Sequence, residues 1–289
     1  MNPTRGDKGV TRVGNREFAW GARTYVMAIL NVTPDSFSGD GVGQNMDVAI
    51  RKAVQFQRDG ADILDIGGES SRPRNAYPDA TEVPAQEEIE RVVPVIEAVA
   101  ARVDIPISVD TRKSEVAQAA IQAGASLVND VWGFKRDPRM ASVVARAGVP
   151  AVLMHNQDGT DYDDLVPDVI AGLRQSLEMA TSAGVLPYNI ILDPGIGFGK
   201  TAEHSLEIQR RLHEFGVLGR PILVGTSRKS TIGLVLDLPV DQRLEGTAAT
   251  VALSIAGGAD IVRVHDVKEM VRVVRMSDAI VRGWSRHGA

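Results

Sequence analysis

The chain contains no cysteine among its 289 residues. Disulfide bonds and thiolate metal sites are therefore excluded, and cysteine usage gives no evidence about the redox compartment. The sequence also lacks any apolar run close to the roughly 20 residues that a membrane-spanning helix needs. Its first segment, MNPTRGDKGVTRVGNRE, has charges but no apolar core region. We therefore expect no signal peptide, no membrane partner and a cytoplasmic location.

A large excess of one charge is missing as well. Lys and Arg number 32 against 37 Asp and Glu, which gives a formal net charge of -5. Because this balance leaves no overall basic footprint, we expect no nucleic-acid partner. Hydrophobic residues make up 44% of the chain and charged residues 24%, a composition typical of globular proteins with a sizeable core.

What the sequence does contain is a repeated unit. Predicted helices end in glycine and are followed directly by an apolar strand, at Gly60, Gly124, Gly148, Gly184, Gly219 and Gly258. Glycine at this position supplies the left-handed conformation that ends a helix. A further junction has Pro106 before the strand ISVD, and the stretch YVMAILN adds a first strand. The pattern therefore predicts eight strands with helices between them.

Strands that alternate with helices form parallel βαβ units, and eight of them predict an α/β fold of the (β/α)8 TIM-barrel type. A doubly wound open sheet is the alternative. We expect a single barrel domain over residues 25–289. Residues 1–24, in which Phe18 and Trp20 alternate with polar residues, are expected to form a short hairpin before the first barrel strand.

Each predicted strand ends in a side chain that can bind a ligand: Asn31, Asp65, Asp110, Asn129, His155, Asp193, Ser227, and Arg263 with His265. In an open sheet, only the strands beside the switch point need polar ends, so polar ends on all eight favour a closed ring. Strand ends also reach the surface and are often polar for that reason alone. We expect this second explanation for two or three of them, such as Asp65.

The stretch IILDPGIGFGKT, residues 190–201, is the most informative in the chain. Its apolar run predicts a buried strand that delivers Asp193 to a glycine-rich loop. The spacing of the glycines excludes both a phosphate-binding P-loop and a dinucleotide-binding fingerprint. Asp193 is therefore expected to face a ligand of another kind, unless the glycines serve a steric purpose only.

Two kinds of polar group are expected at the mouth of the barrel. The acceptors Asp110, Asn129 and Asp193 favour a ligand with several N–H donors, such as a flat heterocycle, although a structural ion pair could explain any one of them. Arg228, Lys229, Arg263 and His265 follow the seventh and eighth strands, where barrels commonly hold phosphate. The first two loops, NVTPDSFSGDG and GGESSRPRNAYPDATEVP, are long enough to be lids or binding segments.

These motifs together resemble the dihydropteroate synthase family from about Tyr25 to Ile280. The resemblance rests on AILNVTPDSFSGDG, DILDIGGESSRP, ISVDTRK, VNDVWGF, ILDPGIGFGKT, GTSRKS, GTAAT and RVHDV, which occur in this order. It implies a (β/α)8 homodimer that joins 6-hydroxymethyl-7,8-dihydropterin diphosphate to p-aminobenzoate. Diphosphate would leave first, with assistance from Mg2+, in a reaction close to SN1.

The resemblance also implies roles for individual residues. Asp110, Asn129, Asp193 and Lys229 would bind the pterin, and Asn31 would lie beside Mg2+ and the diphosphate that Arg263 and His265 hold. Phe37, Ser71, Arg72 and Ser230 would form the p-aminobenzoate pocket. Either Asp35 or Asp40 would face the cation, and we take Asp35 as the catalytic candidate together with Asp110, Lys229, Arg263 and His265.

The chain departs from the family pattern at a few positions. Ser38-Gly39-Asp40-Gly41 replaces SDGG, Ser71 replaces threonine, and Asn156-Gln157 follows His155 in place of Met-Arg. Two other functions remain open: a methyltetrahydrofolate-dependent methyltransferase and a non-catalytic pterin-binding barrel. The basic residues in SRKS and RVHD favour the synthase, because neither alternative has a diphosphate to hold.

Overall fold

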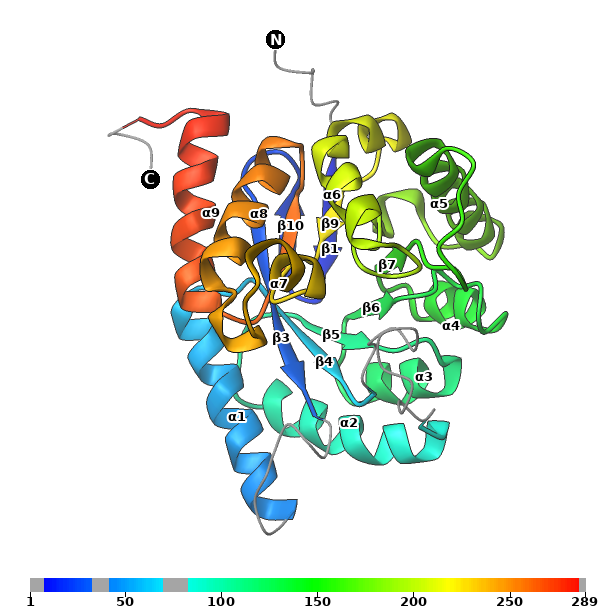
Figure 1. Cartoon of the computed structure of the whole chain (residues 1–289). Coiled ribbons are helices and arrows are strands. Elements are labelled where there is room, and N and C mark those ends of the chain that lie inside the picture. Colours follow the sequence, from blue (N-terminus) through cyan, green and yellow to red (C-terminus); the bar gives the residue numbers. More distant parts are fainter. Residues whose placement is uncertain (1–7, 33–41, 70–82, 286–289) are drawn as a thin grey trace.

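The computed structural model describes residues 8–32, 42–69 and 83–285. A short antiparallel hairpin precedes eight parallel strands that alternate with helices (Figure 1). The strands are β1 Val10–Val13, β2 Arg16–Ala19, β3 Tyr25–Asn31, β4 Ile63–Gly67, β5 Ile107–Asp110, β6 Leu127–Asp130, β7 Ala151–Met154, β8 Ile190–Asp193, β9 Leu223–Val224 and β10 Ile261–Val264. The helices are α1 Val42–Asp59, α2 Ala85–Ala100, α3 Ser114–Gln122, α4 Met140–Ala147, α5 Leu165–Ser182, α6 Ala202–Arg210, α7 Ser230–Leu236, α8 Leu244–Ala256 and α9 Val267–Arg282. Short 3-10 turns cover Pro187–Asn189, Leu212–Leu218 and Val240–Gln242.

The strands form a ring, which confirms the predicted (β/α)8 barrel. Their order is β8-β7-β6-β5-β4-β3-β10-β9, so the last strand of the chain pairs with the first barrel strand. A parallel bridge between Leu192 and Ile222 connects β8 to the segment that enters β9. The first and last helices, α1 and α9, consequently lie side by side (Figure 1). This closure rules out the doubly wound open sheet.

The six glycines predicted to end helices all have positive φ, between +60° and +117°. Gly148 illustrates the reason, because it adopts the left-handed conformation directly after α4 and donates to the carbonyls of Val144 and Ala145. This geometry satisfies the last helical carbonyls and turns the chain toward the next strand. The repeated sequence unit is therefore a repeated βα connection.

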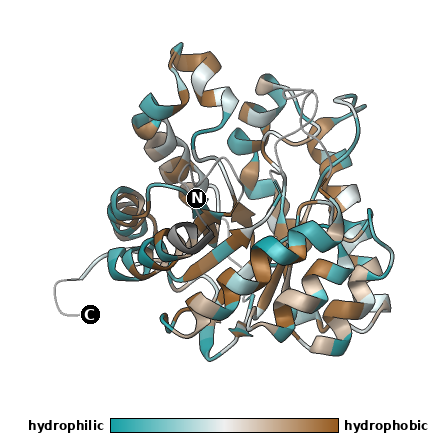
Figure 2. Cartoon of the chain, turned by 90° about the horizontal axis from the view of Figure 1, so that it is seen from below, coloured by the Kyte–Doolittle hydropathy of each residue, from teal (hydrophilic) through white to brown (hydrophobic). Residues whose placement is uncertain are grey.

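The N-terminal hairpin closes the end of the barrel at which the strands begin. Phe18 and Trp20 are buried there against Tyr25, with ring centroids 4.7 Å and 5.5 Å from the tyrosine ring. The indole N–H of Trp20 donates to Thr11 over 2.8 Å, so its polar atom is satisfied. Burial of each large apolar side chain contributes about 1.5–3 kcal/mol. Figure 2 shows the hydrophobic strands enclosed by helices that carry hydrophilic residues.

The strand register arranges the inward-facing side chains in layers, each contributed by alternate strands. One apolar layer, from β4, β6, β8 and β10, consists of Ile63, Leu127, Ile191 and Ile261, all 0% exposed. Two residues further along the same four strands, the register places a polar layer of Asp65, Asn129, Asp193 and Arg263. Around this ring, Asp65 has Asn129 and Arg263 as neighbours and Asp193 opposite.

Within the described ranges, no helix combines sufficient length with sufficient apolar character to cross a membrane.

Candidate active site

A hydrogen-bonded cluster lies at the carboxyl ends of the barrel strands. Arg263 donates from Nε to Asp65 over 2.6 Å and from Nη2 to Asp110 over 2.7 Å. The amide of Asn129 donates to the same Oδ2 atom of Asp65 over 3.0 Å. The structure therefore brings together residues from β4, β5, β6 and β10 that are far apart in sequence.

Burial governs the electrostatics of this cluster. Loss of hydration raises the pKa of Asp110 to about 7, although the positive charge of Arg263 opposes that rise and Asp65 adds to it. The pKa of Arg263 is raised, because the attraction of Asp65 and Asp110 outweighs the effect of burial on the guanidinium. One cation thus lies between two carboxylates, and the group as a whole can accept further N–H donors.

Asp193 is buried at the end of β8 and begins the glycine-rich loop. Its Oδ1 atom accepts a hydrogen bond from the backbone N–H of Gly195 over 2.7 Å. Burial raises the pKa of Asp193, and the nearby Lys229 ammonium is the largest opposing influence. Lys229 donates to the carbonyl of Ile196, and its Nζ atom lies 4.4 Å from the centroid of the Phe198 ring. Burial also lowers the pKa of Lys229 to about 8.

The glycines of this loop allow close approach of a neighbouring segment. A Cβ atom on Gly195 would lie 2.0 Å from the carbonyl oxygen of His155, and one on Gly199 would lie 2.7 Å from that of Gln157. Both glycines also have positive φ, which side chains other than glycine adopt rarely. Close approach and backbone conformation therefore explain why glycine occupies positions 195 and 199.

Lys200 is a residue whose environment the sequence did not reveal. It is buried, with its ammonium 3.0 Å from Nδ1 of His155 and 2.9 Å from the carbonyl oxygen of Phe198. Burial lowers its pKa to about 7. Burial and the charges of Lys200 and Lys135 lower the pKa of His155 to about 2, so its imidazole is neutral. The available signal was a single lysine within a glycine-rich, apolar stretch.

His155 therefore occupies a different place from the other strand ends. Met154 faces the barrel interior, because it pairs in register with Asp193, and the next residue points outward. The imidazole packs against α5, where a Cβ atom on Gly172 would lie 2.6 Å from its Cδ2 atom. His155 thus lies outside the ring of strands, between α5 and the glycine-rich loop, where it contacts Lys200.

The ends of β9 and β10 carry the basic residues predicted for an anion. Nδ1 of His265 lies 3.0 Å from the Ser227 hydroxyl, and burial lowers the pKa of His265 to about 4, so the imidazole is neutral. Arg228 forms an ion pair with Asp266 and adopts a strained φ of 58°. The Thr247 hydroxyl accepts from its backbone N–H. Arg228 is thus engaged in a structural ion pair, whereas Arg263 faces the central cluster.

The remaining predicted site residues fall into two groups. Asn31 is exposed at the end of β3, and Ser230 is exposed at the start of α7. Four other candidates lie outside the described residues: Asp35, Phe37, Ser71 and Arg72.

The interpretation of Asp65 as a surface strand end is wrong. Asp65 is 0% exposed and lies two residues before the end of β4, on the inward face of the barrel. The apolar run that contains it does not show which face each residue occupies, because fully buried parallel strands lack an alternating pattern.

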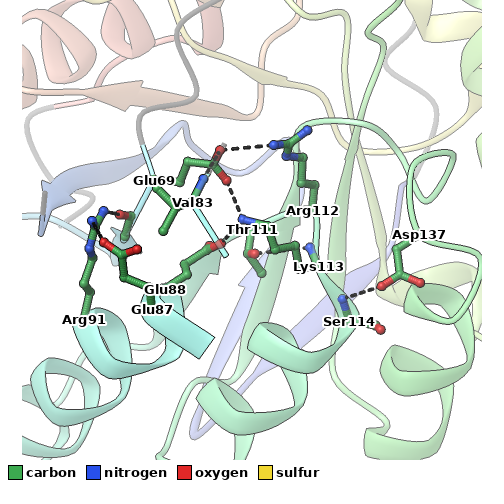
Figure 3. Close-up of polar contacts among 11 residues, drawn as sticks. Glu69, Val83, Glu87, Glu88, Arg91, Thr111, Arg112, Lys113, Ser114 and Asp137 are labelled. Carbon is green, nitrogen blue, oxygen red and sulfur yellow. Dashed lines mark hydrogen bonds and ion pairs between the residues drawn. The ribbon is translucent and has the colours of Figure 1, made fainter. Parts of the chain in front are cut away.

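A second polar network supports the strand ends beside this cluster (Figure 3). Lys113 forms ion pairs with Glu69 and with Glu88, which is almost completely buried on α2. Arg112 donates to the other oxygen of Glu69 over 3.1 Å, and that oxygen also lies 3.4 Å from the backbone nitrogen of Val83. Burial raises the pKa of Glu88, against the opposing charge of Lys113. The network ties β4, the start of α2 and the turn after Asp110 together.

Comparisons with known proteins agree on one family. Residues 27–265 match the family described as pterin binding enzyme. The dihydropteroate synthase of Clostridium beijerinckii is 52% identical over 94% of this chain and 99% of its own length. The chain belongs to the dihydropteroate synthase family.

Solved structures of dihydropteroate synthases extend this agreement to three dimensions. The enzyme from Clostridium difficile, determined in the presence of pteroic acid, superposes with a TM-score of 0.88 at 51% identity and covers 92% of this chain and 99% of its own. The Xanthomonas albilineans enzyme with 4-aminobenzoic acid gives a TM-score of 0.84 at 41% identity, over 90% of this chain and 93% of its own. Every described candidate site residue lies within the part that matches the family.

Proposed function

We propose that this chain condenses 6-hydroxymethyl-7,8-dihydropterin diphosphate with p-aminobenzoate to form 7,8-dihydropteroate and diphosphate. The observation that carries the proposal is the convergence of Asp110, Asn129, Asp193 and Arg263 at the barrel mouth, in a chain with relatives of this activity at 52% identity. Pteroic acid, in one related structure, is the oxidised form of the proposed product, and 4-aminobenzoic acid, in another, is the proposed amine substrate.

The pterin ring is the proposed ligand of the acceptor groups. A pterin presents an amino group beside a ring N–H, which suits the carboxylates of Asp110 and Asp193 and the amide oxygen of Asn129. Lys229 would contact the opposite edge of the ring. These groups face inward from strands of a closed barrel, so the ring would be held on a rigid support.

Loss of the leaving group is the proposed first step. The bond between the methylene carbon and the diphosphate oxygen breaks, and the electron pair leaves with diphosphate. The amine nitrogen of p-aminobenzoate then forms the new carbon–nitrogen bond and releases a proton. Arg263 would stabilise the departing charge, and neutral His265 would donate an N–H to it.

Mg2+ is the proposed cofactor, and Asn31 is the described residue that would hold it. Mg2+ prefers oxygen ligands, keeps several waters and is commonly bound through one or two protein oxygens together with substrate phosphates. The exposed amide of Asn31 at the barrel mouth suits this mode. Among the described residues, no group of three or more His, Asp or Glu side chains is arranged as a metal site. When bound, the ion would neutralise charge on the diphosphate.

The p-aminobenzoate pocket is proposed at Ser230 and at Phe37, Ser71 and Arg72 in the first two loops. Asp35 stays the proposed acid opposite the cationic intermediate. A cytoplasmic location stays a prediction.

A homodimer is the proposed assembly. Exposed apolar side chains gather on three neighbouring helices near the C-terminal end of the chain: Leu234, Val235 and Leu236 on α7, Leu253 on α8, and Met276 and Ile280 on α9. Exposed apolar patches of this kind are typical of protein–protein interfaces.

The decisive experiment mixes the purified protein with the pterin diphosphate, with and without p-aminobenzoate, and measures both products. We expect 7,8-dihydropteroate and diphosphate in equal amounts. A methyltransferase or a non-catalytic pterin-binding barrel would release no diphosphate, and that result would reject the proposal.

A further inference from the structure

Asp65 contacts two residues of the proposed site and has no assigned role of its own. Within the polar layer its neighbours are Asn129 and Arg263, and both donate to its Oδ2 atom. The Oδ1 atom is also buried, and no residue that the structure describes forms a hydrogen bond with it. One carboxylate oxygen therefore connects β6 and β10.

This contact determines which end of the Asn129 amide faces the ligand. A carboxylate only accepts hydrogen bonds, so the NH2 group of Asn129 must turn toward Asp65. The Oδ1 atom of Asn129 is then left to accept from the heterocycle. Without Asp65, the amide could rotate by half a turn and present its donors instead.

The same oxygen fixes the guanidinium of Arg263. Its Nε atom donates to Asp65, while Nη2 donates to Asp110. When Asp110 accepts hydrogen bonds from the heterocycle, the hydrogen bond from Nε of Arg263 to Asp65 still fixes the plane of the guanidinium. The Nη atoms can then turn toward a departing anion.

The need to balance the charge of Arg263 does not by itself explain why a buried carboxylate is present at position 65. Asp110 already supplies one carboxylate to this arginine, and the layer beneath is apolar, with Ile63 directly below Asp65 on β4. A second buried carboxylate costs hydration, and apolar replacements of buried ion pairs are often neutral or stabilising for a fold. A functional constraint accounts for a charge in this place.

We propose that Asp65 is a positioning residue that orients Asn129 for the pterin and Arg263 for the leaving group. The inference rests on the proposed function, since it concerns the same site. Asp65 acts through these two side chains and does not itself touch the substrate.

Asp65→Asn is the test variant, because an amide keeps the shape of the side chain but removes the negative charge that strengthens the hydrogen bonds from Arg263 and Asn129. Asp62→Asn is a matched control: Asp62 is a buried carboxylate on the same segment, paired with Arg23 at the opposite end of the barrel. We expect Asp65→Asn to weaken binding of free 6-hydroxymethylpterin about 10-fold to 100-fold, the range of one charge-assisted hydrogen bond. Asp62→Asn should keep wild-type affinity, and Asp65→Ala provides a second variant that leaves both partners unanchored.

Two measurements distinguish a positioning role of Asp65 from a purely structural one. In a double-mutant cycle with Asn129→Ala, the losses in pterin affinity should fall well short of additive, since Asp65 acts through Asn129. The pH profile of pterin binding should also shift to lower pH in Asp65→Asn. The charges facing Asp110 are Arg263, Asp65, Glu88 and Asp130, and Asp65 is one of those that raise its pKa.

Wild-type pterin affinity in Asp65→Asn and Asp65→Ala would overturn the inference. Additive losses with an unchanged pH profile would also overturn it. These binding measurements do not require turnover, so a protein that binds pterin without forming product would refute the proposed function and still decide the role of Asp65.

Discussion

Nη2 of Arg263 and Oδ2 of Asp110 are joined by a hydrogen bond of 2.7 Å between β10 and β5. The cation proposed for the leaving group therefore lies against a carboxylate proposed for the pterin. The two halves of the site are therefore in contact, and the positive charge of Arg263 lowers the pKa of Asp110.

Arg263→Ala should affect diphosphate and pterin binding in different ways. The variant lacks the positive charge of Arg263 at every pH, so diphosphate binding should be weakened throughout. Arg263 is also the largest influence that lowers the pKa of Asp110, so its removal should keep Asp110 protonated to higher pH. A protonated carboxyl accepts poorly from pterin N–H groups, so we expect pterin affinity to fall near neutral pH and to recover at roughly pH 8–9. Calorimetric titrations of both ligands across this range test the prediction, which equal and pH-independent losses would contradict.

Asp193→Asn should weaken pterin binding by about 1.5–3 kcal/mol, the contribution of a charged hydrogen bond. The amide oxygen can still accept from the N–H of Gly195, so the loop should keep its shape. Asp62→Asn is again the control, since Asp62 is a buried carboxylate at the opposite end of the barrel, where it pairs with Arg23. Unchanged pterin affinity in calorimetry would remove Asp193 from the pocket.

Lys200→Met should change how stability depends on pH. The ordinary lysine pKa is 10.5, and burial lowers that of Lys200 to about 7 in the folded state. Between these values the unfolded chain binds more protons, so the free energy of unfolding rises with pH by up to about 1.4 kcal/mol per pH unit from this group. Lys200→Met should lose this contribution to the dependence of the free energy of unfolding on pH. Lys268→Met, which replaces an exposed lysine, should retain it. Urea unfolding at several pH values measures this dependence for the wild type and both variants. Equal slopes of unfolding free energy against pH in all three proteins would contradict the prediction.

Charges introduced on α9 should prevent the proposed dimer. Met276 and Ile280 are 62% and 72% exposed and lie one helical turn apart, so Met276→Lys with Ile280→Lys places two charges in the apolar patch. Tyr188→Lys with Val217→Lys is the control, since these exposed residues lie elsewhere. Light scattering after size exclusion should give a dimer for the wild type and control and a monomer for the α9 variant. A monomeric wild type would contradict the assembly.

Asn31→Ala should raise the Mg2+ concentration needed to support diphosphate binding, because an oxygen ligand is lost. Asn31→Asp keeps that oxygen and should restore the wild-type Mg2+ dependence. Calorimetric titration of diphosphate at a series of Mg2+ concentrations gives the readout without turnover. Identical Mg2+ dependence in all three proteins would exclude Asn31 as a ligand.

Local sequence patterns were sufficient to predict the barrel. The glycines that end helices, such as Gly148, act through backbone conformation alone, and apolar runs mark buried strands without reference to distant residues. The placement of Asp110, Asn129 and Asp193 at one mouth follows from the parallel strand direction.

Contacts between distant segments were not predictable in the same way. The inward position of Asp65 depends on the register between strands, and the pairing of Arg263 with Asp110 depends on how a long side chain turns across the barrel. The burial of Lys200 requires knowledge of how closely the segment after β7 approaches the glycine-rich loop. A single sequence contains no direct record of such distances.

The hairpin that seals the far end of the barrel offers an attachment point for experiments. Val10 is 49% exposed on β1, and the natural chain has no thiol. Val10→Cys would therefore create a unique site for a fluorophore or a surface tether. Because the hairpin packs where the strands begin, a protein immobilised through it would present its substrate entrance to the solution.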